Sequence, residues 1–120
     1  MVKGLVVTTE NEVSVKEFEQ PLYESLGEVV GGFIEIVHPR GLVYPLVMIV
    51  NEEGLMQSLP LNLVGSYLYE THKHGHPIVG NVVIMAEGMT PSGYDITGLP
   101  DDAIESLKNQ ISQILGGKRQ

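Results

Sequence analysis

Residues 77–85 have the sequence PIVGNVVIM, and this run of valine and isoleucine predicts a buried β-strand, the element on which the fold depends. Glycine and proline recur in the segment that follows, from Gly88 to Pro100, which we interpret as a loop. About a dozen residues is long for a structureless connection in a compact domain, so we expect this loop to have a function.

Beyond this loop, apolar residues recur at helical spacing and predict an amphipathic helix at the C-terminal end of the chain. The predicted first turn is acidic, through Asp101, Asp102 and Glu105, and the helix dipole favours anions at that end. Gly116-Gly117 is expected to end the helix. The apolar positions are Ile104, Leu107, Ile111 and Ile114.

The N-terminal part of the chain predicts a hairpin followed by a short helix. The two strands of the hairpin are expected at 2–8 and 13–19, where β-branched residues alternate partly with polar ones. A helix with Pro21 in its first turn is expected, and it should stop at Gly31-Gly32. Its apolar face is formed by Leu22, Leu26, Val29 and Val30.

Two further strands are predicted between this helix and the middle of the chain. They lie at 33–37 and 43–50, separated by the turn residues Pro39-Arg40-Gly41. Pro45 cannot donate a hydrogen bond to a strand ladder, so it belongs at the start of the second strand or on a sheet edge.

A tight turn is predicted at 51–54, with Asn51 bonding its own backbone and Gly54 at positive φ. We expect this turn to lead into a strand at 55–57. Periodicity alone assigns 63–69 to neither helix nor strand, and we favour a short helix.

These elements predict a single α+β domain with a mainly antiparallel sheet and two or three short helices, including the C-terminal one. The chain has 120 residues, of which 42% are hydrophobic and 18% charged, as in ordinary globular proteins. We expect the globular domain to cover residues 1–117 and residues 118–120 to form a disordered tail.

The charge of the chain argues against nucleic acid as a partner. Fifteen acidic and seven basic residues give a formal net charge of −8, which repels phosphate backbones. The acidic residues are spread along the sequence, and this distribution favours solubility over imitation of nucleic acid.

The chain contains no cysteine, so disulfide bonds and thiolate metal sites are excluded. Its first residues include an apolar stretch too short for a signal peptide or a membrane span. We therefore expect a cytoplasmic protein, in the host cell if a phage encodes it, with no membrane partner.

No residue pattern in the chain predicts an enzyme. The serines lack a nucleophile-elbow pattern, the glycines near residue 30 close a helix and do not open one, and Glu52-Glu53 is better explained as a solvent-facing turn. His72, His74 and His76 would lie on one face of a strand, but their neighbours are typical of a solvated loop. We expect no catalytic residue, no cofactor and no metal, although the sequence leaves metal binding by this loop open.

Two segments carry residues suited to binding a small ligand. His38, Arg40 and Tyr44 combine an imidazole, a permanent cation and an aromatic ring, which together could clamp an anionic or planar molecule. The loop from Thr90 to Asp95 offers backbone N–H groups, hydroxyl groups and a ring. The candidate ligand-binding residues are His38, Arg40, Tyr44, Asn62, Thr90, Ser92, Tyr94 and Asp95.

Four short segments follow one another in an order found in one protein family. They are GGFIEIV (31–37), NEEG (51–54), LPLN (59–62) and PIVGNVVI (77–84). Over about residues 2 to 115 the chain thereby resembles the uncharacterised family domain of unknown function 3846, whose members are small proteins of bacteriophages, plasmids and their bacterial hosts. The resemblance implies a genomic setting and an overall layout, and it carries over no catalytic residue.

What the resemblance implies makes our leading hypothesis a non-enzymatic phage or mobile-element accessory protein, acting in counter-defence. It would bind and sequester a small, nucleotide-derived ligand. The alternative is an interaction module that inhibits a host enzyme through an acidic surface. Oligomerisation of identical chains is also consistent with the sequence, because one sheet with few helices can leave a face to be covered by a second copy.

Overall fold

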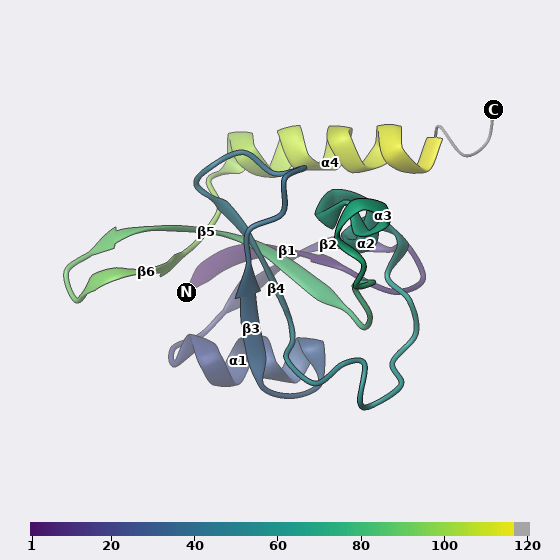
Figure 1. Ribbon diagram of the computed structural model, residues 1–120. Helices are drawn as coiled ribbons and strands as arrows, with labels where there is room; N and C mark the ends of the chain where they lie inside the picture. Colours follow the sequence, from purple (N-terminus) through teal and green to yellow (C-terminus); the bar gives the residue numbers. More distant parts are fainter. Residues whose placement is uncertain (117–120) are drawn as a thin grey trace.

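The computed structural model describes residues 1–116, apart from the side chains of His72 and His74. Its elements confirm the predicted α+β domain with an antiparallel sheet and a C-terminal helix (Figure 1). The predicted tail at 118–120 lies outside the described residues. The elements are β1 (Val2–Val7), β2 (Val13–Phe18), α1 (Leu22–Val30), β3 (Ile34–Val37), β4 (Leu46–Asn51), α2 (Leu63–Tyr69), α3 (Thr71–His74), β5 (Val82–Thr90), β6 (Gly93–Thr97) and α4 (Asp101–Gly116).

The sheet has the strand order β2-β1-β5-β4-β3, with β6 paired to β5, and every pairing is antiparallel. The stretch on which the fold was expected to depend therefore supplies the central strand. The prediction placed its start at Pro77, whereas β5 begins at Val82. The difference arises at Gly80, which takes φ of +80° and donates its N–H to Pro60 O at 2.7 Å, away from the sheet ladder.

The segment from Gly88 to Pro100 is not the predicted loop. Residues 88–90 continue β5 and residues 93–97 form β6, so most of the segment is a hairpin. The Thr90 side chain closes its turn, because Oγ1 donates to Gly93 O at 2.6 Å and accepts from Ser92 N at 3.2 Å. Gly93 supplies the positive φ of the turn.

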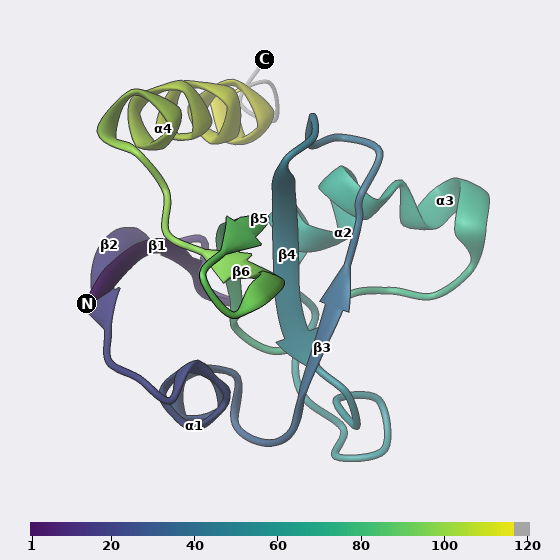
Figure 2. The same ribbon diagram turned by 90° about the vertical axis from the view of Figure 1, so that its left-hand side faces the viewer.

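Helices cover both faces of the sheet, and Figures 1 and 2 show α1 on one side and α2 and α4 on the other. Because side chains alternate along a strand, β5 contributes Val82 and Ile84 to the core beneath α2 and α4, and Val83 and Met85 to the core beneath α1. The central strand is thus buried on both faces, as its composition indicates.

The predicted helices are confirmed. On α1, the apolar residues Leu22, Leu26 and Val30 are buried against the sheet, and Gly31 ends the helix in the left-handed conformation with φ of 89°. On α4, Ile104, Leu107 and Ile111 form the buried face. Segment 63–69 is helical, as we favoured.

The segment after β4 differs in part from the prediction. Asn51 does bond the local backbone, because its Oδ1 accepts from Glu53 N at 2.8 Å. Residues 52–58 then continue in successive turns and form no strand at 55–57. The positive φ of 55° is found at Ser58 and not at Gly54. The bond from Gln57 N to Glu53 O, at 3.0 Å, coils the segment, so it cannot extend into a hairpin arm.

No helix within residues 1–116 combines the length and hydrophobicity needed to cross a membrane.

Candidate functional site

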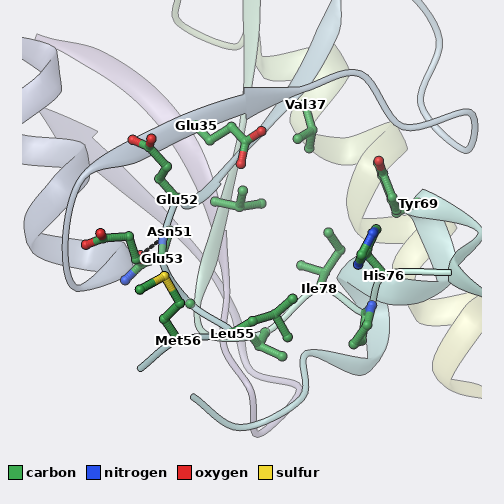
Figure 3. Close-up of a pocket in the computed structure, with 14 residues that line it drawn as sticks. Glu35, Val37, Asn51, Glu52, Glu53, Leu55, Met56, Tyr69, His76 and Ile78 are labelled. Carbon is green, nitrogen blue, oxygen red and sulfur yellow. Dashed lines mark hydrogen bonds between the residues drawn. The ribbon is translucent and has the colours of Figure 1, made fainter. Parts of the chain in front are cut away.

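A pocket of about 340 Å³ opens at the β3 end of the sheet, between β3, the turns after β4 and the segment that leads from α3 toward β5 (Figure 3). We call it the β3 pocket. Its volume is within the range of small-molecule sites in proteins. The pocket is lined by Glu35, Val37, Val50, Asn51, Glu52, Glu53, Gly54, Leu55, Met56, Tyr69, His76, Pro77, Ile78 and Val79.

The β3 pocket combines apolar and acidic groups. Val50 and Ile78 are buried and belong to the core, so they form an apolar base. Figure 3 shows Glu52 and Glu53 on one side of the pocket and His76 on the opposite side, with Glu35 pointing from β3 toward the space between them. Among the residues that the structure describes, neither a lysine nor an arginine lines the pocket. The pocket therefore favours a cationic group over an anionic one.

The wall on the β4 side is held by Asn51, whose side chain is 5% exposed. Its Nδ2 donates to Val30 O at 3.1 Å and to Gln57 Oε1 at 3.0 Å, while its Oδ1 accepts from Glu53 N. One amide thus joins the end of β4, the end of α1 and the turns at 52–58. This network fixes the backbone of Glu53, which lines the pocket.

A second concave surface lies between α1 and the start of β3, and we call it the α1–β3 groove. Its volume is about 660 Å³. It shares Glu53 with the β3 pocket, and within residues 1–116 no lysine or arginine lines it either. The groove is lined by Tyr23, Glu24, Gly27, Glu28, Gly32, Phe33, Ile34, Glu53 and Gln57.

The structure brings together the two segments that were predicted to bind a ligand. The Tyr94 hydroxyl donates to the Tyr44 hydroxyl at 3.1 Å, across a gap of fifty residues. His38 Nε2 lies 3.0 Å from Glu87 Oε1, on the strand next to Tyr94. Both tyrosines are more than half exposed, and neither lines the β3 pocket or the α1–β3 groove.

The other predicted ligand residues are dispersed. Arg40 is exposed in the turn before β4, and Ser92 is exposed at the tip of the β5–β6 hairpin. Thr90 closes that hairpin, and Asp95 Oδ1 accepts from Ile96 N at 2.7 Å. Asn62 is fully buried, and its hydrogen bonds go to protein backbone.

The electrostatic surroundings of Tyr94 predict an unusual titration. The hydrogen bond to Tyr44, partial burial and the negative charge of Glu87 together raise the pKa of Tyr94 from 10.0 to about 12. Between pH 10 and 12, Tyr94 is deprotonated in the unfolded chain and still protonated in the folded chain. The contribution of Tyr94 to the free energy of unfolding is therefore fully present below pH 10 and is lost as the pH rises toward 12.

We expect the Tyr44→Phe variant to titrate Tyr94 closer to pH 10 than the native chain, because the largest cause of the shift is then removed. Difference absorbance of the tyrosinate band, with Tyr94→Phe used to assign the signal, measures this. Tyr67→Phe, at an exposed site on α2, is the control and should leave the titration of Tyr94 unchanged. An equal shift in both variants would contradict the role of Tyr44.

The residues of the β3 pocket were not predicted as a site. Glu52-Glu53 was interpreted as a solvent-facing turn, and both residues are exposed there. His76 was considered only with His72 and His74, whose side chains lie outside the described residues. Among the side chains that are described, no group of three or more histidine, aspartate or glutamate residues is arranged to hold a metal ion.

The fold and the pocket define a small α+β protein with a six-stranded antiparallel sheet and an acidic cavity at one end of it. A family model described as Domain of unknown function (DUF3846) matches residues 2–112. The chain belongs to this family, and the resemblance noted in the sequence is confirmed. No curated protein and no solved structure matches the chain at a significant level.

Proposed function

We propose that the protein is a non-catalytic binding protein that sequesters a small ligand in the β3 pocket. The observation that carries this proposal is the composition of the pocket, in which the buried apolar side chains of Val50 and Ile78 line the same space as Glu35, Glu52 and Glu53. Pockets that combine an apolar surface with a few polar groups are typical of small-molecule sites. The ligand that fits this composition carries an amine or guanidinium group on an apolar body.

The charge of the pocket argues against the nucleotide-derived ligand that the sequence suggested. Phosphate groups would meet Glu35, Glu52 and Glu53, and no lysine or arginine of the described residues lines the pocket, which opposes phosphate binding. We therefore propose a cationic ligand, and nucleotides are the alternative ligand class that the experiment must exclude.

The biological setting of this proposal is the one that the family resemblance implies. A phage or plasmid protein that sequesters a host-made small molecule would act in counter-defence, in the cytoplasm of the host. Sequestration requires affinity and stoichiometry, and it requires no chemical step.

Calorimetric titration tests the ligand class, with agmatine and phenethylamine as cationic probes and ADP-ribose and a cyclic dinucleotide as anionic ones. We expect heat of binding from at least one amine and none from the nucleotides. In Glu35→Lys, the amine affinity should fall by about tenfold or more, because a cation then occupies the mouth of the pocket.

The matched control is Glu17→Lys, which makes the same charge change at an exposed position on β2 and should retain the amine affinity. Binding of the nucleotides alone, or equal loss in the two variants, would overturn the proposed ligand class.

A second candidate function is inhibition of a host protein through an acidic surface. The observation that favours it is the α1–β3 groove, whose exposed aromatic residues lie beside carboxylates.

A further inference from the structure

The α1–β3 groove exposes large apolar side chains. Tyr23 on α1 is 62% exposed and Phe33, just before β3, is 76% exposed. Aromatic residues that share one exposed surface are enriched where proteins bind one another. The groove is lined by residues of α1 and of the start of β3. Figure 2 shows β3 at the edge of the sheet, beside β4.

The charges of the groove select among possible occupants. Glu24, Glu28 and Glu53 line it and are exposed, and no lysine or arginine of the described chain lies among the lining residues. A second copy of the chain, docked about a twofold axis, would place these carboxylates opposite each other, which is repulsive. A basic partner is the complementary occupant.

The backbone of β3 provides the second part of this surface. Glu52 N donates to Phe33 O at 2.8 Å, so these opposed residues form a hydrogen-bonded pair of the β3–β4 ladder. Such pairs alternate along an antiparallel ladder, so Glu35 and Val37 are bonded to β4. The N–H and C=O groups of Ile34 and Ile36 therefore point away from β4. No strand of the described chain pairs with that side of β3.

We propose that the free side of β3 and the α1–β3 groove together bind an extended, basic segment of another protein by strand addition. The backbone of the segment pairs with Ile34 and Ile36 of β3. Its side chains on the α1 face pack against Tyr23 and Phe33, and its lysine or arginine residues meet the carboxylates of the groove. Backbone pairing provides affinity in such complexes, and the flanking side chains provide specificity.

Amide hydrogen exchange of the whole chain, resolved by residue, tests the backbone part of the proposal. The probe is a short end-blocked peptide in which valine and lysine occupy every second position in turn, so that both lie on one face of the strand, with threonine at the positions between. The control peptide has glutamate in place of lysine. In the free protein, the amides of Glu35 and Val37 should exchange slowly and those of Ile34 and Ile36 rapidly. The lysine peptide should slow the exchange of Ile34 and Ile36, and the glutamate peptide should not. Unchanged exchange at both residues would overturn strand addition.

Variants of β3 separate backbone pairing from packing. Ile36→Pro removes an N–H that the β4 ladder does not use, so the fold should persist while the peptide affinity falls roughly tenfold or more. Ile36→Ala removes the same apolar side chain but keeps the N–H, and it should bind nearly as tightly as the native chain. Equal binding by the two folded variants would contradict strand addition.

Charge variants test the groove even if the proline variant does not fold. Glu24→Lys with Glu28→Lys should weaken binding of the lysine peptide by about tenfold or more and make it less dependent on salt. The control is Glu17→Lys with Glu105→Lys, which changes the net charge equally at exposed positions on β2 and α4. If both double variants bound the lysine peptide equally weakly, the net charge of the chain and not the groove would attract the peptide, which would contradict the proposal. Sedimentation that shows a dimer disrupted by the groove variant would assign the groove to a second copy, against the proposal.

Discussion

Replacing Asn62 with alanine should lower the free energy of unfolding by about 3 to 5 kcal/mol, because three buried backbone groups lose their partner together. Asn62 is 0% exposed, and its Nδ2 donates to Val7 O at 3.0 Å and to Gly80 O at 2.9 Å. Its Oδ1 accepts from Gly65 N at 2.8 Å and caps α2. One side chain therefore ties β1, α2 and the approach to β5 together.

Chemical denaturation of Asn62→Ala, Asn62→Asp and Asn81→Ala measures this effect and separates its causes. Asn81 is a half-buried asparagine whose side chain accepts one bond, from Thr9 N at 3.2 Å, so its loss should cost about 1 kcal/mol. Asn62→Asp keeps the oxygen that caps α2 but replaces Nδ2, the donor to the two backbone carbonyl groups, with a second oxygen. This variant should be at least as unstable as the alanine variant. A stable aspartate variant would show that only the cap matters.

Replacing Leu26 with alanine should lower the free energy of unfolding by about 2 to 5 kcal/mol, because it leaves a cavity between α1 and the sheet. Leu26 is 0% exposed and lies at the centre of the buried face of α1, between Leu22 and Val30. Within residues 1–116, no second helix lies on the α1 side of the sheet to fill the space (Figure 1). The cavity should therefore remain largely unfilled.

The matched control for Leu26→Ala is Glu28→Ala, two residues along the same helix on its exposed side. It should change stability by no more than about 0.5 kcal/mol. Urea denaturation followed by circular dichroism measures both variants. A loss of less than about 1 kcal/mol for Leu26→Ala would mean that α1 repacks or contributes little to the fold.

Local patterns in the sequence predicted most of the fold. The periodicity of Leu22, Leu26 and Val30 is set within one helix, and so is the spacing of Ile104 and Leu107 on α4. The hairpin formed by β5 and β6 was missed because Gly88 and Gly93 are equally typical of loops. Its strand character depends on pairing across the turn and on the burial of Ile96, and neither is encoded in a run of neighbouring residues.

The β3 pocket could not be predicted, because its walls are assembled from segments that are distant in the sequence. Glu35, Glu52 and Ile78 meet only after β3 pairs with β4 and the approach to β5 folds back beside them. Asn62 illustrates the opposite error. Residue type alone does not show whether a side-chain amide is free to bind a ligand or is already hydrogen-bonded to the backbone. The burial of the side chain distinguishes the two cases.

Asn51 connects the two concave surfaces through one hydrogen-bond network. Its amide fixes Glu53, which lines both surfaces, and it also binds Val30 O at the end of α1. A ligand that displaces this amide from one side alters the geometry on the other. Thermodynamic linkage is reciprocal. If a ligand in the pocket changes the affinity of the groove for its partner by some factor, the partner changes the affinity of the pocket for the ligand by the same factor.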